Sequence, residues 1–161
     1  MRPSTRLVAV LAALAASLAF TAAPAQAAPT TDFYADSGDR CVYGAAKGTF
    51  DWNPPTASIL PAVYATGSLI DRPTLRELSV CGNDLMYTVV TFSAYARAVL
   101  VDTEAVKADN GTAGINVLLS GRAGVIDTVI VQVCRHSTVP TFAPVDYCGA
   151  RVAYVRPGIK V

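Results

Sequence analysis

The chain has 161 residues, of which 13 are basic and 12 are acidic, so its formal net charge is +1 at pH 7. A nearly neutral chain gives no reason to expect nucleic acid or an anionic membrane as a partner. Hydrophobic residues make up 52% of the chain, enough for a folded core, and it contains four cysteines and one histidine. Only one histidine is therefore available for acid–base catalysis near neutral pH.

The first 27 residues have the three parts of a secretory signal peptide. Arg2 and Arg6 precede an apolar run from Leu7 to Phe20, and Ala25 and Ala27 are the small residues that signal peptidase accepts. The run is shorter than the roughly 20 apolar residues of a membrane-spanning helix. We therefore expect cleavage after Ala27, secretion, and no membrane association afterwards. Removing 27 of 161 residues leaves 134, the size of one domain.

After the signal, we expect residues 28–40 to be a flexible lead-in and residues 41–161 to form a single domain. The range Thr30–Pro61 is rich in Gly, Pro, Asp and Ser, which predicts mostly loop with one or two short strands. The clearest strand is "TFDW", in which Phe50 and Trp52 alternate with polar residues.

The centre of the chain is the most regular part. "AVYATGSLI" is interrupted at Gly67 and predicts two short strands or one bulged strand, and "TLRELSV" fits a strand or a helical turn. The range Leu85–Val101 is rich in β-branched and aromatic residues but too long for one typical strand, so we divide it near Ser93–Ala96. The dipeptide Asn110-Gly111 predicts a tight turn, although "TEAVKA" before it fits a short helix.

The last third predicts three strands, "INVLLS", "VIDTVIVQVC" and "ARVAYVR". Apolar residues lie on both faces of the second of these, which indicates a strand near the centre of a sheet or between two layers. Short strands separated by Gly, Asn and Pro, with hardly any helical periodicity, predict an all-β protein. The specific expectation is an immunoglobulin-like or Greek-key β-sandwich stabilised by two disulfides.

The four cysteines, Cys41, Cys81, Cys134 and Cys148, all follow the predicted signal. An even number in an oxidising compartment predicts two disulfides. The favoured pairing is Cys41 with Cys81 and Cys134 with Cys148, and the other two pairings stay open because sequence does not fix connectivity. No two cysteines have the short spacing of a zinc site, and no metal or cofactor is expected.

His136 is the first candidate for catalysis because an unperturbed imidazole titrates near neutral pH. No G-x-S-x-G nucleophile motif is present, and the cysteines are better used in disulfides. The surrounding "RHSTVPTFAP" has the composition of an exposed loop. We therefore expect a strand that leads into a disulfide-closed loop carrying a solvated histidine, with a small extracellular hydrolase or lyase as the alternative.

The acidic residues suggest a second kind of site. Asp102, Glu104, Asp109 and Asn110 offer oxygen ligands for calcium but do not follow the alternating pattern of a known calcium loop. The remaining acids are scattered singly, so no glycosidase pair can be chosen from their spacing. A solvated hairpin connection is the favoured interpretation of this segment.

The aromatic residues offer a third kind of site, a stacking platform for a sugar or a partner protein. Packing in the core is the more common use of such residues and is favoured here. Trp52, which is followed by Asn-Pro-Pro, is the aromatic residue that we most expect to be partly exposed.

The segments "CVYGAAKGTFDW", "ATGSLIDRP", "VDTEAVKADNGT", "VIVQVCR" and "DYCG" resemble a group of small secreted actinomycete proteins with four cysteines. The Ala-rich signal with "APAQAAPT" is similar to the signals of such bacteria. The resemblance implies an extracellular, disulfide-bonded domain and carries no catalytic residue across.

The leading functional expectation is a non-enzymatic extracellular module that binds a protein, a glycan or the cell surface. Its expected binding loops are the disulfide loop, which begins with Arg135 and His136, and the segment from Asp102 to Thr112. A further alternative is a surface protein that self-associates through the edge of a sheet.

Overall fold

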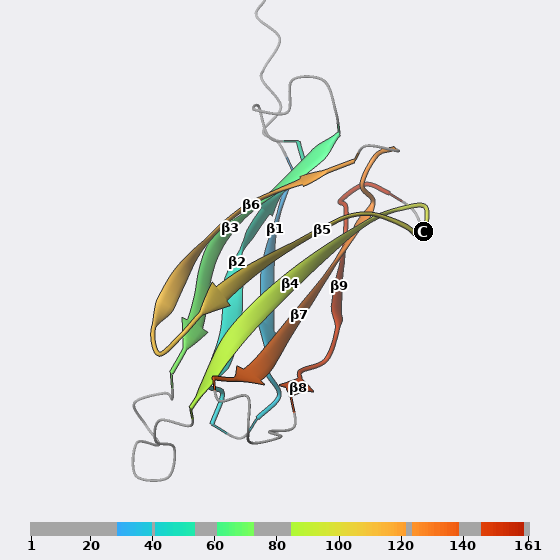
Figure 1. Cartoon of the computed structure of the whole chain (residues 1–161). Coiled ribbons are helices and arrows are strands. Elements are labelled where there is room, and N and C mark those ends of the chain that lie inside the picture. The colour runs from blue at the N-terminus through green and yellow to red at the C-terminus, as the bar shows by residue number, and fades with distance from the viewer. Residues whose placement is uncertain are drawn as a thin grey trace, which may run out of the picture.

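The computed structural model describes residues 29–39, 41–53, 61–72, 85–121, 124–138 and 146–159. These residues form nine strands in two sheets that pack face to face (Figure 1). The all-β class and the two-layer architecture expected from the sequence are therefore confirmed. The described part contains no helix long and apolar enough to cross a membrane. The predicted signal, residues 1–27, and the segment "TLRELSV" lie outside the described residues.

Each sheet is antiparallel and combines strands that are distant in sequence. The first sheet has the order β1 (Thr30–Asp36), β2 (Gly44–Asp51), β3 (Ala62–Asp71) and β6 (Thr112–Ser120). The second sheet has the order β5 (Val99–Ala108), β4 (Met86–Ala96) and β7 (Thr128–Ser137), and both β8 (Tyr147–Cys148) and β9 (Val152–Val155) pair with β7. The chain crosses between the sheets from β3 to β4, from β5 to β6 and from β6 to β7. As expected, β7 is central in its sheet.

Alternation of side chains along the strands builds the core. On β4, Val90, Phe92 and Ala94 are buried, whereas the residues between them are partly exposed on the other face of the sheet. The rings of Phe33, Phe50 and Phe92 meet between the two layers at centroid distances of 4.6 to 6.1 Å. Close aromatic contacts of this kind add to the free energy gained by burying apolar area.

The seam between β1 and β9 is closed by one tyrosine. The hydroxyl of Tyr154 donates to the carbonyl of Tyr34 at 2.7 Å and accepts from its N–H at 2.8 Å. These bonds satisfy backbone groups on an edge strand that would otherwise be open to pairing with another chain. Partial burial and the neighbouring carboxylate of Asp36 raise the pKa of the Tyr34 phenol.

Two boundaries expected from the sequence are wrong. The range 28–40, expected to be a flexible lead-in, contains strand β1, which pairs along its whole length with β2. The division of Leu85–Val101 falls at Arg97–Ala98 and not near Ser93–Ala96, because β4 continues to Ala96 before the chain turns into β5.

"AVYATGSLI" forms one continuous strand, β3, and Gly67 lies in its middle. Gly67 pairs with Gly48 of β2, and a Cβ atom on Gly67 would lie only 2.7 Å from the Cα atom of Gly48. The glycine at this position therefore allows two backbones to approach closely and does not end the strand.

The β4–β5 turn is made by two residues with left-handed backbone angles, Arg97 with φ of 50° and Ala98 with φ of 66°. An L-residue with a side chain pays a penalty of about 1–2 kcal/mol in this conformation, whereas glycine does not. Replacing Ala98 by glycine is therefore expected to stabilise the protein by about 0.5–1 kcal/mol, after subtracting the greater freedom of glycine in the unfolded chain. Urea unfolding followed by circular dichroism measures this change.

The matched control for this prediction is Ala113→Gly, which makes the same substitution inside strand β6. It is expected to destabilise the protein by about 0.5–1 kcal/mol, because glycine weakens a strand interior. Equal destabilisation by both substitutions would contradict the proposed strain at Ala98.

Candidate functional site

The strands β4 and β7 place two rows of side chains on the solvent-facing side of the second sheet, which we call the outer face. From one end to the other, the paired positions of these rows are Tyr95 with Thr128, Ser93 with Ile130, Thr91 with Gln132, Val89 with Cys134, and Tyr87 with His136. Their inward-facing neighbours fill the core. The outer face is therefore a fixed surface whose composition is set by every second residue of two paired strands.

The Tyr95 end of the outer face is hollowed. A cavity of about 600 Å³ is lined by the apolar groups of Tyr95, Ala98, Ile130 and Ile159 and by the polar groups of Arg97, Asp127 and Thr128. A second hollow of about 130 Å³ shares Tyr95 and Ile130 with it and adds Thr91, Ser93, Gln132 and Arg151. We call these two hollows together the groove. An apolar lining with a few convergent polar groups is typical of ligand sites.

Asp127 holds the walls of the groove together. Its carboxylate accepts a hydrogen bond from the N–H of Arg97 at 2.6 Å, and its own N–H donates to the carbonyl of Tyr95 at 3.0 Å. Its carbonyl accepts from the N–H of Arg156 at 2.8 Å. The β4–β5 turn, the start of β7 and the segment after β9 are thus joined at one residue, so the groove is built before any ligand binds.

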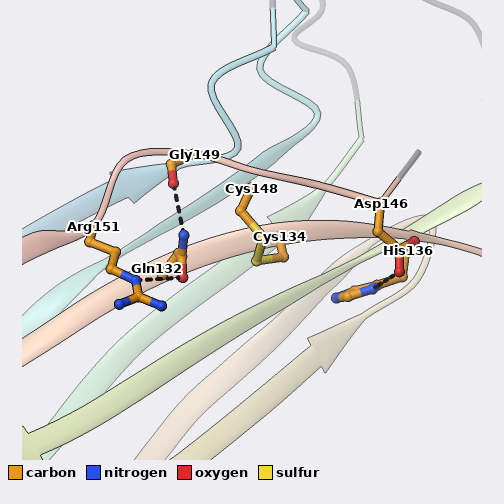
Figure 2. Close-up of a disulfide and its surroundings, with 7 residues drawn as sticks. All are labelled: Gln132, Cys134, His136, Asp146, Cys148, Gly149 and Arg151. Carbon is orange, nitrogen blue, oxygen red and sulfur yellow. Dashed lines mark hydrogen bonds and ion pairs between the residues drawn. A yellow bond between two sulfur atoms is a disulfide. The ribbon is translucent and has the colours of Figure 1, made fainter.

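The opposite side of the groove carries a chain of side-chain hydrogen bonds (Figure 2). The amide nitrogen of Gln132 donates to the carbonyl of Gly149 at 3.1 Å, and Nε of Arg151 donates to the amide oxygen of Gln132 at 3.3 Å. The first bond fixes which end of the amide faces Arg151, and the second holds the Nε of the guanidinium group. The remaining nitrogens of Arg151 form no bond with the described residues.

His136 lies at the other end of the outer face, near the end of strand β7. It was expected in a loop, and this expectation is corrected by its pairing with Tyr87 of β4. Its ring stacks on Tyr87 at a centroid distance of 5.4 Å, and its Nδ1 lies 3.1 Å from a carboxylate oxygen of Asp146. The ammonium group of Lys107 lies 3.8 Å from the centre of the Tyr87 ring. His136 is thus held by a ring and a carboxylate, apart from the groove.

The disulfide between Cys134 and Cys148 is confirmed, and the two cysteines are directly opposite on β7 and β8 (Figure 2). It lies on the outer face between the groove and His136. Cys41 is disulfide-bonded as well, and Cys81, the partner expected for it, lies outside the described residues.

Arg135 and Trp52, expected to contribute to binding, are buried, and these two expectations are corrected. Arg135 is 1% exposed because it points inward from β7, where it forms an ion pair with Asp71. Trp52 is fully buried in the core, which agrees with the favoured prediction that the aromatic residues pack there. Its indole N–H donates to the hydroxyl of Thr31 at 3.0 Å. Neither side chain can contact a ligand on the surface.

The acidic segment from Asp102 to Thr112 was expected to be a loop, but strand β5 continues to Ala108. The carboxylate of Asp102 accepts from the N–H of Ser120 on β6 at 2.7 Å, and Glu104 lies on the same strand, opposite Phe92. Only residues 109–111 form the turn, in which Asn110 has a left-handed φ of 50° as the dipeptide predicted.

The structure therefore does not gather the four oxygen-bearing residues of this segment. Asp102 and Asp109 are seven positions apart, about 23 Å if fully extended. Asp109 lies 3.7 Å from Lys107, and Asn110 donates its N–H to Asp71. Within the described ranges, no three His, Cys, Asp or Glu side chains are grouped to hold a metal ion.

Of the residues that line the groove, the sequence pointed only to Tyr95, as one of the aromatic residues of a possible stacking platform. A period-two division of "YTVVTFSAYA" would have separated the buried row of β4 from the outer row that carries Tyr87, Thr91, Ser93 and Tyr95. Comparison with known proteins found no matching family model, no similar curated protein and no similar solved structure.

Proposed function

We propose that the protein is a secreted, non-enzymatic binding module whose ligand lies in the groove of the outer face. The observation that carries this proposal is a pair of hollows that share Tyr95 and Ile130, where an aromatic ring, aliphatic side chains and polar groups converge. Strands β4 and β7 supply Tyr95, Thr128 and Ile130, and the hydrogen bonds of Asp127 hold the turn residues of the lining against them, which lowers the entropy lost on binding. The signal-like residues 1–27 and the disulfide support an extracellular location.

The chemistry of the groove favours binding over catalysis. Asp127, the carboxylate that lines it, already accepts a hydrogen bond from Arg97 and joins the walls. His136 is eight positions from Thr128 along β7, about 26 Å in an extended strand, so it does not reach a ligand seated beside Tyr95. The described part of the groove therefore supplies stacking and hydrogen bonds and holds no positioned acid–base pair.

The strand order supports an immunoglobulin-like Greek key as the finer description of the fold. In that fold, strands B and E are neighbours in one sheet, and strands C, F and G are neighbours in the other. Here β3 and β6 are neighbours in the first sheet, and β4, β7 and β9 are neighbours in the second, with β5 in the place of strand C′. Strand β1 is an addition at the edge of the first sheet.

The test is binding of the full, oxidised chain to arrays of neutral oligosaccharides, charged oligosaccharides and peptides. The variant is Tyr95→Ala, which removes the ring between the two hollows. The matched control is Thr66→Ala, an exposed position on the outer side of the first sheet. Wild type and Thr66→Ala are expected to bind the same probes, and Tyr95→Ala is expected to bind them about tenfold more weakly or worse.

Equal binding by Tyr95→Ala would place the site elsewhere and overturn the proposed groove. Conversion of a bound probe into products would overturn the non-enzymatic part of the proposal. Circular dichroism of each variant confirms that a loss of binding does not follow from unfolding.

The second candidate function is a small extracellular hydrolase or lyase, which the contact between His136 and Asp146 favours. A carboxylate that orients an imidazole is part of many acid–base sites. In this case a substrate would be cleaved by wild type and left intact by His136→Ala, whereas Tyr95→Ala would keep the activity.

A further inference from the structure

The polar groups of the groove divide into two kinds. Thr91, Ser93, Thr128 and Gln132 supply neutral hydroxyl and amide groups that both donate and accept hydrogen bonds. Arg97 and Arg151 supply cationic groups that only donate. A ligand that matches this lining carries many hydroxyl groups and also carries negative charge.

Arg151 is oriented to receive a planar anion. Its Nε donates to Gln132, which is itself held by the carbonyl of Gly149. This arrangement leaves the two terminal nitrogens of the guanidinium group, which form no bond with the described residues. Two adjacent N–H donors in one plane match the two oxygens of a carboxylate.

Arg97 adds a second cation at the far end of the groove. Its backbone N–H is bound by Asp127, but its guanidinium group has no partner within the described part of the chain. Among the described residues, the lining of the groove includes two arginines and one carboxylate, and that carboxylate is already hydrogen-bonded. The local charge is complementary to an anionic ligand.

The apolar lining restricts the ligand further. Tyr95 and Ile130 lie in both hollows, between the positions of Arg97 and Arg151. A pyranose ring has an apolar C–H face that packs on an aromatic ring, while its hydroxyl groups reach hydrogen-bond partners at its edge. Thr128 and Gln132 are four positions apart on β7, about 13 Å along the strand, which suits a short chain of sugars better than a single one.

From these features we infer that the groove binds an acidic glycan, an oligosaccharide of hexuronic acid units. This inference rests on the proposed binding function and names its ligand class. One sugar ring stacks on Tyr95, carboxylates of the chain pair with Arg151 and Arg97, and the hydroxyl groups bond to the neutral side chains of β4 and β7.

The experiment is isothermal titration calorimetry of the full, oxidised chain with oligogalacturonate. The matched probe is the methyl ester of the same oligosaccharide, which keeps the sugar and removes the charge. Poly-glutamate serves as an acidic probe without sugar. Oligogalacturonate is expected to bind at least tenfold more tightly than its methyl ester and than poly-glutamate.

Variants then assign the binding to the groove. Arg151→Gln is expected to lower the affinity for oligogalacturonate at least tenfold and to leave the weak affinity for the methyl ester unchanged. Arg151→Lys, which keeps the charge but loses the paired donors, is expected to recover only part of the loss. Lys47→Gln removes one exposed charge from the outer side of the first sheet and is expected to change nothing.

The contrary outcomes are distinct. Equal affinity for the acid and its ester would overturn the charged ligand while leaving a glycan-binding groove. Equal affinity for oligogalacturonate and poly-glutamate would show that charge alone drives binding, and it would overturn the proposed glycan ligand. An equal loss of affinity in Lys47→Gln and Arg151→Gln would lead to the same conclusion. If oligogalacturonate does not bind but a probe of another class binds in a Tyr95-dependent way, this inference fails and the proposed function stands.

Discussion

Replacing Arg135 by methionine is expected to lower the free energy of unfolding by about 3–5 kcal/mol. The side chains of Arg135 and Asp71 are 1% and 2% exposed, and they form an ion pair that joins β7 to the end of β3. Arg135 also donates to the hydroxyl of Thr88 on β4 at 2.8 Å. Methionine keeps an unbranched apolar side chain but leaves the carboxylate of Asp71 buried without its cation. Urea unfolding followed by far-ultraviolet circular dichroism measures the loss.

The control is Arg151→Met, which makes the same substitution at an exposed arginine and is expected to change stability by less than about 0.5 kcal/mol. Asp71→Asn combined with Arg135→Met is expected to cost less than the sum of the single substitutions, because neither partner then leaves a buried charge. A strictly additive double variant would show that the ion pair does not couple the two residues.

Replacing Trp52 by alanine is expected to lower the free energy of unfolding by about 3–5 kcal/mol. The side chain is fully buried and packs on Phe50 with ring centroids 5.7 Å apart. Its removal creates a cavity in a core that is otherwise closely packed, and the loss follows from both the missing apolar area and the missing contacts. Urea unfolding followed by far-ultraviolet circular dichroism is suitable because the variant has no tryptophan.

Two further measurements test whether Trp52 is a buried core residue or an exposed binding residue. Thr31→Ala removes only the hydrogen-bond acceptor of the indole N–H and is expected to cost about 1 kcal/mol. Trp52 is the single tryptophan of the chain, so native fluorescence reports on it alone. We expect emission typical of an apolar environment and weak quenching by acrylamide. Emission typical of water-exposed indole would contradict the core position of Trp52.

Strand patterns were the part of the fold that the sequence predicted well. Phe50 and Trp52 alternate with polar residues and are both buried, and the "TVIVQVC" part of "VIDTVIVQVC" belongs to the central strand β7, which begins at Thr128. Asn110-Gly111 forms the predicted turn because its backbone angles are set locally. The predictions were less accurate where the local preference for helix or strand was weak. The segment "TEAVKA" fitted a short helix, but it continues strand β5 because it pairs with β4.

The candidate site was not predictable in the same way. Arg135 was expected on a loop surface because "RHSTVPTFAP" has the composition of an exposed loop, and only its meeting with Asp71, 64 positions earlier, explains its burial. The groove depends on the register between β4 and β7, which sets Tyr95 opposite Thr128 and Ser93 opposite Ile130. A shift of one residue would replace this outer row by the buried one.

The amino-acid sequence by itself determined the all-β class and the turn at Asn110-Gly111, since period-two alternation and turn chemistry are local properties. Tertiary structure alone decided which charged residues are buried, that β1 belongs to the first sheet, and which side chains meet in the groove. These features depend on pairing between strands far apart in the chain. That pairing is fixed by the burial of one face of each sheet against the other, a constraint that no short segment contains.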